Sequence, residues 1–269
     1  DQIDVDFVAE LGGFSQKNRY ELRVQASTVG LFYDDNWRRD YTIQFAKVLT
    51  AFTTTDPYGE IIYKSLGLQN SIYMGYGYSP REYAKLNIPY QYDVSFVGAA
   101  NSTRRWIVDY LRKSQIKVNT FGFGWPSGPI SQKQMVEVFN SSRINLNLSN
   151  SALSDIRYVL SGPRALLNYL RSPKRVEQLK GRHVEINACG GFQLSFYADG
   201  IQDLYQIDQE IAIYQNIDDL VGKIQFYLKH DSTREKLARQ GYEKTVNHYT
   251  FGQRLQYLFA EVQRIQEKP

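Results

Sequence analysis

Residues 94–113 read VSFVGAANSTRRWIVDYLRK, and this stretch decides the fold. The apolar run at its start, 94–97, predicts a buried strand. The small residues at 98–101 predict a tight turn. Residues 102–113 then predict a helix that begins with a Ser or Thr cap. A strand, a turn and a helix are therefore expected in immediate succession.

The alternation of strands and helices continues on both sides of this stretch. Further strands are predicted at 5–9, 28–33, 49–54, 71–74, 117–121, 144–148, 192–195 and 211–214. Helices are predicted at 40–48, 57–66, 131–141, 165–170, 181–188, 217–228, 232–246 and 251–265. This pattern favours an α/β fold with parallel sheets and helices on both faces. In such folds, ligands bind beyond the carboxyl ends of the strands.

One passage interrupts the alternation. Residues 75–92 are rich in Gly, Tyr and Pro and show no helical period, which is typical of an interdomain linker. We therefore predict a partial N-terminal Rossmann-like domain at 1–80, a linker at 81–92 and a C-terminal Rossmann-like domain at 93–250. The cleft between the two domains is the expected site.

Composition narrows the class of protein. The chain has 269 residues, 32 Lys and Arg against 28 Asp and Glu, and a formal net charge of +4. A mean hydropathy of −0.46 excludes a disordered chain, and no run of about 18 apolar residues could span a bilayer. The small net charge gives no reason to expect nucleic-acid binding. We expect a cytoplasmic protein, although a chain that opens at Asp1 suggests that a preceding segment has been removed.

Four segments carry a resemblance to a known family: YDVSFVG at 92–98, FGFGW at 121–125, NLNLS at 145–149 and KGRHVEINACGG at 180–191. In order and spacing they resemble the spore-maturation-protein-B-like glycosyltransferases. The resemblance implies a GT-B fold, in which two Rossmann-like domains face each other. It implies that the C-terminal domain, of glycosyl transferases group 1 type, holds a nucleotide-sugar donor. It also implies that a last helix within 251–269 packs back on the N-terminal domain, which would be incomplete here.

Two cations, Lys180 and Arg182, lie at the start of the helix predicted at 181–188. Cations beside the free backbone N–H groups of a helix N-terminus favour pyrophosphate binding. The diphosphate leaving group of glycosyl transfer gains negative charge, which such a site would stabilise. Because cations can do the work that a metal does in other folds, we expect no metal and no cofactor. The alternative is a solvated helix start.

Two glutamates flank these cations. Glu185 lies three positions after Arg182 and shares its helical face. The resemblance implies that Glu185 binds the ribose hydroxyls, and an ion pair with Arg182 is the alternative. Glu177 lies eight positions before Glu185, a spacing similar to the Glu-x7-Glu motif of retaining GT-B enzymes, whose first Glu contacts the donor sugar. We therefore treat Glu177 as a candidate catalytic residue, and His183 as a candidate phosphate contact.

Small residues at the ends of strands complete the predicted donor site. Gly190 and Gly191 permit close approach of the backbone to a ligand. Gly98 and Asn101 either contact phosphate or sugar, or form an ordinary strand-to-helix turn. Gly124 and Trp125 could flank the nucleotide base, and Trp125 either stacks on it or lies in the core. The single Cys of the chain is expected to pack.

A general base is harder to find. Inverting GT-B enzymes often have a His base in the N-terminal half, whereas His183, His230 and His248 all lie in the other half. Asp34 and Asp35 follow a predicted strand, and Asp35 could act as base or bind acceptor. Helix N-capping is an equally good interpretation of the pair. The lack of a clear base favours a retaining mechanism.

We therefore expect a metal-independent glycosyltransferase that uses a nucleotide-diphospho-sugar donor. Its acceptor would be a glycan, a lipid or a protein, and peripheral contact with a membrane stays open. The alternatives are a catalytically inert GT-B-like module that binds nucleotide or glycan, and a sugar-nucleotide epimerase.

Overall fold

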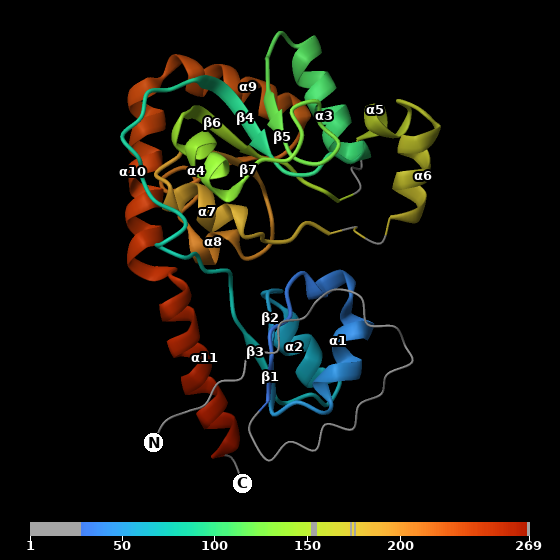
Figure 1. The fold of residues 1–269 in the computed structure, drawn as a ribbon. Helices are drawn as coiled ribbons and strands as arrows, with labels where there is room; N and C mark the ends of the chain where they lie inside the picture. The colour runs from blue at the N-terminus through green and yellow to red at the C-terminus, as the bar shows by residue number, and fades with distance from the viewer. Residues whose placement is uncertain (1–27, 152–154, 173, 175, 268–269) are drawn as a thin grey trace.

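The computed structural model describes residues 28–151, 155–172, 174 and 176–267. These residues form two domains, stacked one above the other in Figure 1. The smaller domain has a parallel sheet in the order β1-β2-β3, with β1 at Val29–Gly30, β2 at Ala51–Thr54 and β3 at Ser71–Tyr73. Its helices are η1 (Asp35–Trp37), α1 (Arg39–Ala46) and α2 (Gly59–Ser65). The strand predicted at 5–9 lies outside the described residues.

The larger domain has a second parallel sheet, in the order β5-β4-β6-β7-β8. Its strands are β4 (Tyr92–Val97), β5 (Asn119–Phe121), β6 (Ser142–Asn147), β7 (Gln193–Phe196) and β8 (Ala212–Tyr214). Its helices are α3 (Ser102–Lys113), α4 (Gln132–Asn140), α5 (Ile156–Val159), α6 (Pro163–Arg171), α7 (Arg182–Ala188), α8 (Ile201–Leu204), α9 (Ile217–Lys229) and α10 (Asp231–His248). The prediction of an α/β fold with parallel sheets is confirmed.

The stretch 94–113 folds as its sequence predicts, with one change at the cap. The last four residues of β4 are buried, between β5 on one side and β6 on the other. Asn101 caps α3, because its side chain accepts a hydrogen bond of 2.8 Å from the backbone N–H of Arg104. An amide oxygen thus satisfies the N–H that we had expected a Ser or Thr hydroxyl to satisfy.

The chain crosses between the domains twice, and the two crossing segments lie next to each other. The first crossing follows β3, and the second lies between α10 and α11 (Phe251–Gln266). The N–H of Tyr78 donates to the carbonyl of Tyr249 (3.0 Å), and the N–H of Phe251 donates to the carbonyl of Tyr78 (2.9 Å). These bonds hold the two crossing segments side by side.

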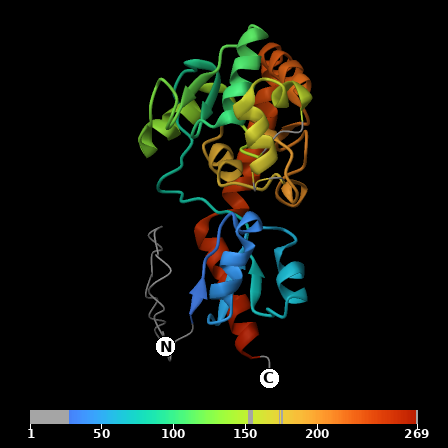
Figure 2. The same cartoon turned by 90° about the vertical axis from the view of Figure 1, so that its right-hand side faces the viewer.

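Helix α11 runs along the smaller domain, as Figures 1 and 2 show. Its apolar side chains bury one face of the small sheet in a common cluster of Leu258, Val262, Ala51, Ile72 and Met74. The smaller domain is therefore covered on this face by the last helix of the chain.

Two helices, α5 and α8, were not predicted. Each has four residues, which is too short for a helical period to show in the sequence. Among the described residues, no helix is both long and apolar enough to cross a membrane.

Candidate functional site

The stretch before α7, in its described residues 174 and 176–181, lies at the carboxyl ends of β6 and β7, because Glu177 bonds Ser149 and Lys180 contacts Phe196. It faces the smaller domain, because the ammonium of Lys174 lies 4.4 Å from the centroid of the Trp37 ring. Beside Trp37, residues of η1 and α1 line an open cavity of about 390 Å³. Parallel α/β sheets bind ligands at this edge, so the cleft between the domains is the place to look for chemistry.

The ammonium of Lys180 is buried where the two domains meet, close enough to Asp34 of the smaller domain for that carboxylate to act on its pKa. It lies 4.4 Å from the centroid of the Phe196 ring and has no hydrogen-bond partner within the part of the chain that the structure describes. Burial, together with the positive charge of Arg104, lowers the pKa of Lys180 to about 7. Glu177 and Asp34 act in the opposite direction. The site thus holds a cation that the protein itself does not fully compensate.

Glu177 is fixed by two serines that follow β6. The hydroxyl of Ser149 donates to one carboxylate oxygen, and that of Ser151 donates to the other at 3.2 Å. Both oxygens are therefore held in place, three residues before Lys180 in the chain. The sequence placed Glu177 in the site, but it gave no sign of the two serines.

Arg104, in the first turn of α3, lies close enough to Lys180 for its charge to lower the pKa of that residue. Its guanidinium donates to the carbonyl oxygens of Leu148 (3.1 Å), Ser149 (3.2 Å) and Ala99 (2.9 Å). Burial lowers the pKa of Arg104 to about 10. Arg104 therefore ties the loop after β6 to the turn after β4, and it adds positive potential to the cleft.

Arg182 and Glu185 form an ion pair on one face of α7, as their spacing predicts. The guanidinium of Arg182 lies 5.6 Å from the centroid of the Phe139 ring, and burial lowers its pKa. Arg182 thus points toward α4, whereas Lys180 contacts the end of β7. The two cations that we had grouped by sequence do not converge on one point.

Several backbone N–H groups at the N-terminus of α7 are used within the turn itself. The N–H of His183 donates to the carbonyl of Lys180, and the N–H groups of Val184 and Glu185 donate to the carbonyl of Gly181. The N–H of Lys180 donates to the Nδ1 atom of His183. These backbone groups are therefore engaged within the turn, and α7 has only seven residues. The turn thus occupies the N–H groups of His183, Val184 and Glu185, and diphosphate binding at the start of α7 stays a prediction.

His183 is a core residue. It is fully buried, its Nε2 atom lies 3.0 Å from the hydroxyl of Ser195, and burial lowers its pKa to about 3. A neutral imidazole enclosed in this way cannot reach a phosphate. Our expectation that His183 binds the donor was therefore wrong.

Gly190 and Gly191 lie at the other end of α7 from Lys180. Gly190 has φ = +71° and ends the helix, and a Cβ added there would lie 2.9 Å from the side chain of Lys85. A Cβ at Gly191 would lie 2.8 Å from the carbonyl oxygen of Phe139. The two glycines allow close packing within the protein, and their contact with the donor stays a prediction.

The structure does bring Gly98, Gly124 and Trp125 together, beyond the ends of β4 and β5. The indole N–H of Trp125 donates to the carbonyl of Gly98 at 2.8 Å, and the guanidinium of Arg105 lies 5.4 Å from the centroid of the Trp125 ring. The side chain of Asn101 is used as the cap of α3. The Trp125 ring is thus packed against protein groups and is not fully open to a nucleotide base. The donor contacts of these residues stay predictions.

Asp35 is buried and bonded on both oxygens. It accepts hydrogen bonds from the hydroxyls of Tyr63 (2.8 Å) and Thr54 (2.7 Å) and from the N–H of Thr55 (3.1 Å). A carboxylate held in this way stabilises the smaller domain and cannot meet an acceptor, so the proposed catalytic role was wrong.

Asp34, the neighbour of Asp35, lies nearer the cleft. It occupies the N-cap position of η1 at φ = +55°, but its side chain forms no cap bond. Instead it accepts a hydrogen bond of 2.7 Å from the hydroxyl of Tyr76, in the first crossing segment. Helix N-capping, the alternative interpretation of Asp34 and Asp35, therefore does not describe the Asp34 side chain. Tyr76 was not predicted as a site residue, because nothing in its local sequence marks it.

The sequence model of the glycosyl transferase-like family matches residues 103–260, which include Arg104, Glu177, Lys180 and Glu185. The chain belongs to this family. The spore protein CgeB of Bacillus subtilis (strain 168) is 22% identical to this glycosyl transferase-like chain over 240 residues, which is 81% of this chain and 69% of CgeB. These two matches confirm the family resemblance.

Solved structures are similar to this glycosyl transferase-like chain in fold. Sucrose-phosphate synthase from Thermosynechococcus elongatus gives a TM-score of 0.60 at 12% identity, over 85% of this chain and 62% of the synthase. HepE from Anabaena in complex with UDP and glucose gives 0.60 at 9% identity, over 84% of this chain and 66% of HepE. A mutant of TarM from S. aureus, in complex with Fondaparinux, alpha-GlcNAc-glycerol and UDP, gives 0.63 at 10% identity, over 88% of this chain and 50% of TarM. The fold is GT-B, and the chain spans less than two thirds of the length of each of these structures.

Proposed function

We propose that this chain transfers a sugar from a nucleotide-diphospho-sugar to a glycan, lipid or protein acceptor, with no required metal ion. The observation that carries the proposal is the buried ammonium of Lys180, which has no hydrogen-bond partner among the described residues. A buried, incompletely compensated cation is costly. A bound diphosphate would offset that cost, and its growing charge during bond cleavage would be stabilised by the same ammonium.

Glu177 is the residue that we assign to the donor sugar. Its carboxylate is fixed by Ser149 and Ser151, close enough to Lys180 to raise the pKa of that residue. A carboxylate beside the diphosphate would lie near the anomeric carbon, where positive charge develops as the leaving group departs. Because Asp35 is bonded inside the smaller domain, we favour a retaining reaction that needs no base from that residue.

Glu185 is the residue that we assign to the ribose. Its carboxylate pairs with Arg182 and lies against Gly181, on the helix that follows Lys180. An acceptor of this kind can receive hydrogen bonds from two adjacent hydroxyls. The ion pair with Arg182 would then orient the carboxylate rather than compete with the ligand.

The proposal is tested by calorimetric titration of the protein with UDP, GDP, dTDP and their sugar conjugates, in buffer containing EDTA. We expect one nucleotide series to bind, and Lys180→Met to weaken it by about 30-fold or more, since removing one partner of a buried charge contact costs about 2–5 kcal/mol. Lys236→Met, at an exposed position of α10, is the matched control.

Turnover assays separate the alternatives. Release of nucleotide diphosphate from the donor in the presence of EDTA supports the proposal. Binding without any turnover identifies an inert binding module, and a changed sugar nucleotide with no release identifies an epimerase. Equal affinity of Lys180→Met and the unmodified protein would show that the donor site has been placed wrongly.

A further inference from the structure

Helices α5 and α6 form a short hairpin at one side of the larger domain. They stand beyond α3 in Figure 1 and face the viewer in Figure 2. The buried side of the hairpin is well defined. Ala165 is buried, and the side-chain amide of Asn168 donates to the hydroxyl of Tyr158 at 2.7 Å. This inner face fixes the direction in which the opposite face points.

The opposite face of the hairpin is apolar. Leu166, Leu167 and Leu170 lie on one side of α6, since residues three and four apart are neighbours on a helix, and they are 43%, 47% and 59% exposed. At α5, Ile156 is 64% exposed and Leu160 is 76% exposed. We call the three leucines of α6 the leucine face; Ile156 and Leu160 are further exposed apolar residues of the same hairpin. A helix of a soluble domain normally points its apolar stripe at the core and its polar side chains at solvent, and α6 shows the reverse.

The segment 156–176, which contains the hairpin, is strongly basic. Residues 156–176 contain five cations, Arg157, Arg164, Arg171, Lys174 and Arg175, and no acidic residue. The whole chain carries a net charge of +4, so the residues outside this segment carry −1 in total. Arg164 and Arg171 are exposed and lie on the same helix as the leucines. Arg164 and Arg171 therefore place positive charge beside the leucine face, whereas Arg157 is paired with carboxylates and Lys174 contacts Trp37.

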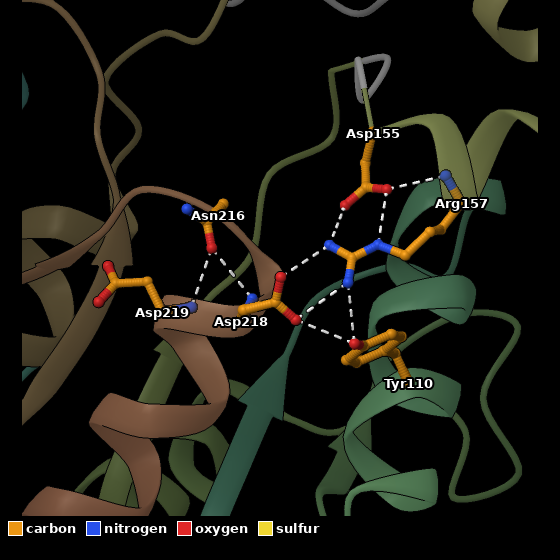
Figure 3. A network of polar contacts seen from close by, with 6 residues as sticks. All are labelled: Tyr110, Asp155, Arg157, Asn216, Asp218 and Asp219. Carbon is orange, nitrogen blue, oxygen red and sulfur yellow. Dashed lines mark hydrogen bonds and ion pairs between the residues drawn. The ribbon is translucent and has the colours of Figure 1, made fainter.

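The base of the hairpin is braced, as Figure 3 shows. The guanidinium of Arg157 bridges Asp155 (2.7 Å) and Asp218 (3.0 Å), and the hydroxyl of Tyr110 also bonds Asp218 at 3.0 Å. These contacts hold α5 to α3 and to the start of α9. Asp155 and Asp218 compensate the charge of Arg157, whereas Arg164 and Arg171 lie farther along the hairpin. The brace ties the α5 side of the hairpin to α3 and α9.

We propose that this hairpin docks on an anionic lipid bilayer, with the leucine face in the boundary between headgroups and acyl chains. Arg164 and Arg171 then lie at the level of the lipid phosphates. Basic side chains flanking an apolar helical face bind anionic membranes through both buried apolar area and electrostatic attraction. A second copy of the chain fits less well, because a symmetric contact would place two basic segments against each other.

Docking needs neither donor nor turnover, so it can be tested apart from the proposed function. The full chain is mixed with vesicles of phosphatidylcholine alone, or of phosphatidylcholine and phosphatidylglycerol in equal parts, and bound protein is measured by flotation. We expect binding to the anionic vesicles that weakens with added salt. Leu167→Asp is expected to weaken binding by about tenfold or more, and Arg164→Gln by about fivefold.

A matched variant tests the location. Ile61→Asp changes another exposed aliphatic residue, on α2 of the smaller domain, and is expected to bind like the unmodified protein. Because Cys189 is the single Cys and is buried, Leu167→Cys and Ile61→Cys can each be labelled with an environment-sensitive dye. Emission is expected to shift to the blue at position 167, and not at 61, when anionic vesicles are added.

The result is decisive in both directions. Salt-sensitive binding that requires Leu167 but not Ile61 supports the docking. The proposal is overturned by equal binding of both Asp variants, by absence of binding to anionic vesicles, or by a dimer in sedimentation that Leu167→Asp dissociates. Unchanged circular dichroism and thermal unfolding of Leu167→Asp, expected for a half-exposed side chain, verify that the variant is folded.

Discussion

Replacing Lys180 with Met is expected to make the protein more stable while it loses its affinity for the donor. The pKa of Lys180 is lowered from 10.5 to about 7. Each pKa unit corresponds to about 1.4 kcal/mol, so the charged side chain destabilises the fold by at most about 5 kcal/mol at neutral pH. Relaxation of the surrounding protein reduces the cost of a buried charge, and we expect Lys180→Met to gain about 2 kcal/mol.

The stability that Lys180→Met gains over the unmodified protein is expected to fall as the pH rises. Between about pH 7 and pH 10.5 the unfolded chain keeps the proton on Lys180 and the folded chain loses it. The unmodified protein therefore becomes relatively more stable as the pH rises through this window. The advantage of Lys180→Met should be full at pH 6 and much smaller at pH 9.

Calorimetric unfolding at pH 6 and pH 9 measures this difference, with Lys236→Met as the control. A gain of about 2 kcal/mol corresponds to a rise in Tm of about 4–8 °C for a chain of this size. If Lys180→Met were less stable than the unmodified protein at pH 6, or if its advantage were equal at both pH values, Lys180 would not be an uncompensated cation. The main support for the donor site would then be lost.

Three further predictions follow from the same contacts. The Kd for a nucleotide sugar, whose diphosphate has a constant charge in this range, should rise by up to about tenfold per unit above pH 7, and Lys180→Arg should flatten this profile in calorimetric titrations. Glu177→Gln should lower kcat by about 100-fold and change the Kd for the nucleotide diphosphate much less when both are measured at pH 6; an equal effect on kcat and Kd would indicate a structural role. Asp35→Asn should lower the free energy of unfolding by about 1–3 kcal/mol, because Tyr63 and Thr54 share its acceptor oxygen. A selective loss of kcat in folded Asp35→Asn would restore the catalytic interpretation.

The sequence predicted the long elements well and the short ones poorly. Helix α3 has the predicted bounds, because a turn of small residues and a capping side chain mark its start. The first described strand was predicted at 28–33, whereas β1 covers Val29–Gly30. Beyond it, the N–H of Phe32 donates to the hydroxyl of Thr53 and that of Asp34 to the hydroxyl of Thr55. Side-chain hydroxyls thus replace the backbone hydrogen bonds of the sheet there. A local sequence pattern cannot show this replacement.

The candidate site was predicted in part. Glu177 and Lys180 lie together in the cleft, as their place in the chain suggested. His183 follows Lys180 closely in the sequence, but the turn before α7 directs its ring into the core. The burial of Asp35 depends on Tyr63, 28 positions away. Contacts between residues so far apart in the chain are set by packing and leave no mark on either local sequence.

The paired crossing at Tyr78 and Tyr249 limits how the two domains can move. Two covalent connections are joined there by backbone hydrogen bonds, so the domains can neither slide apart nor twist freely about a single tether. A swing about an axis through that junction is the relative motion that these bonds hinder least. In such a swing, the displacement of a residue grows with its distance from the junction. Residues near the junction, such as Tyr76, would keep their neighbours, whereas a contact at the open edge, such as that of Lys174 with Trp37, would form and break with each swing.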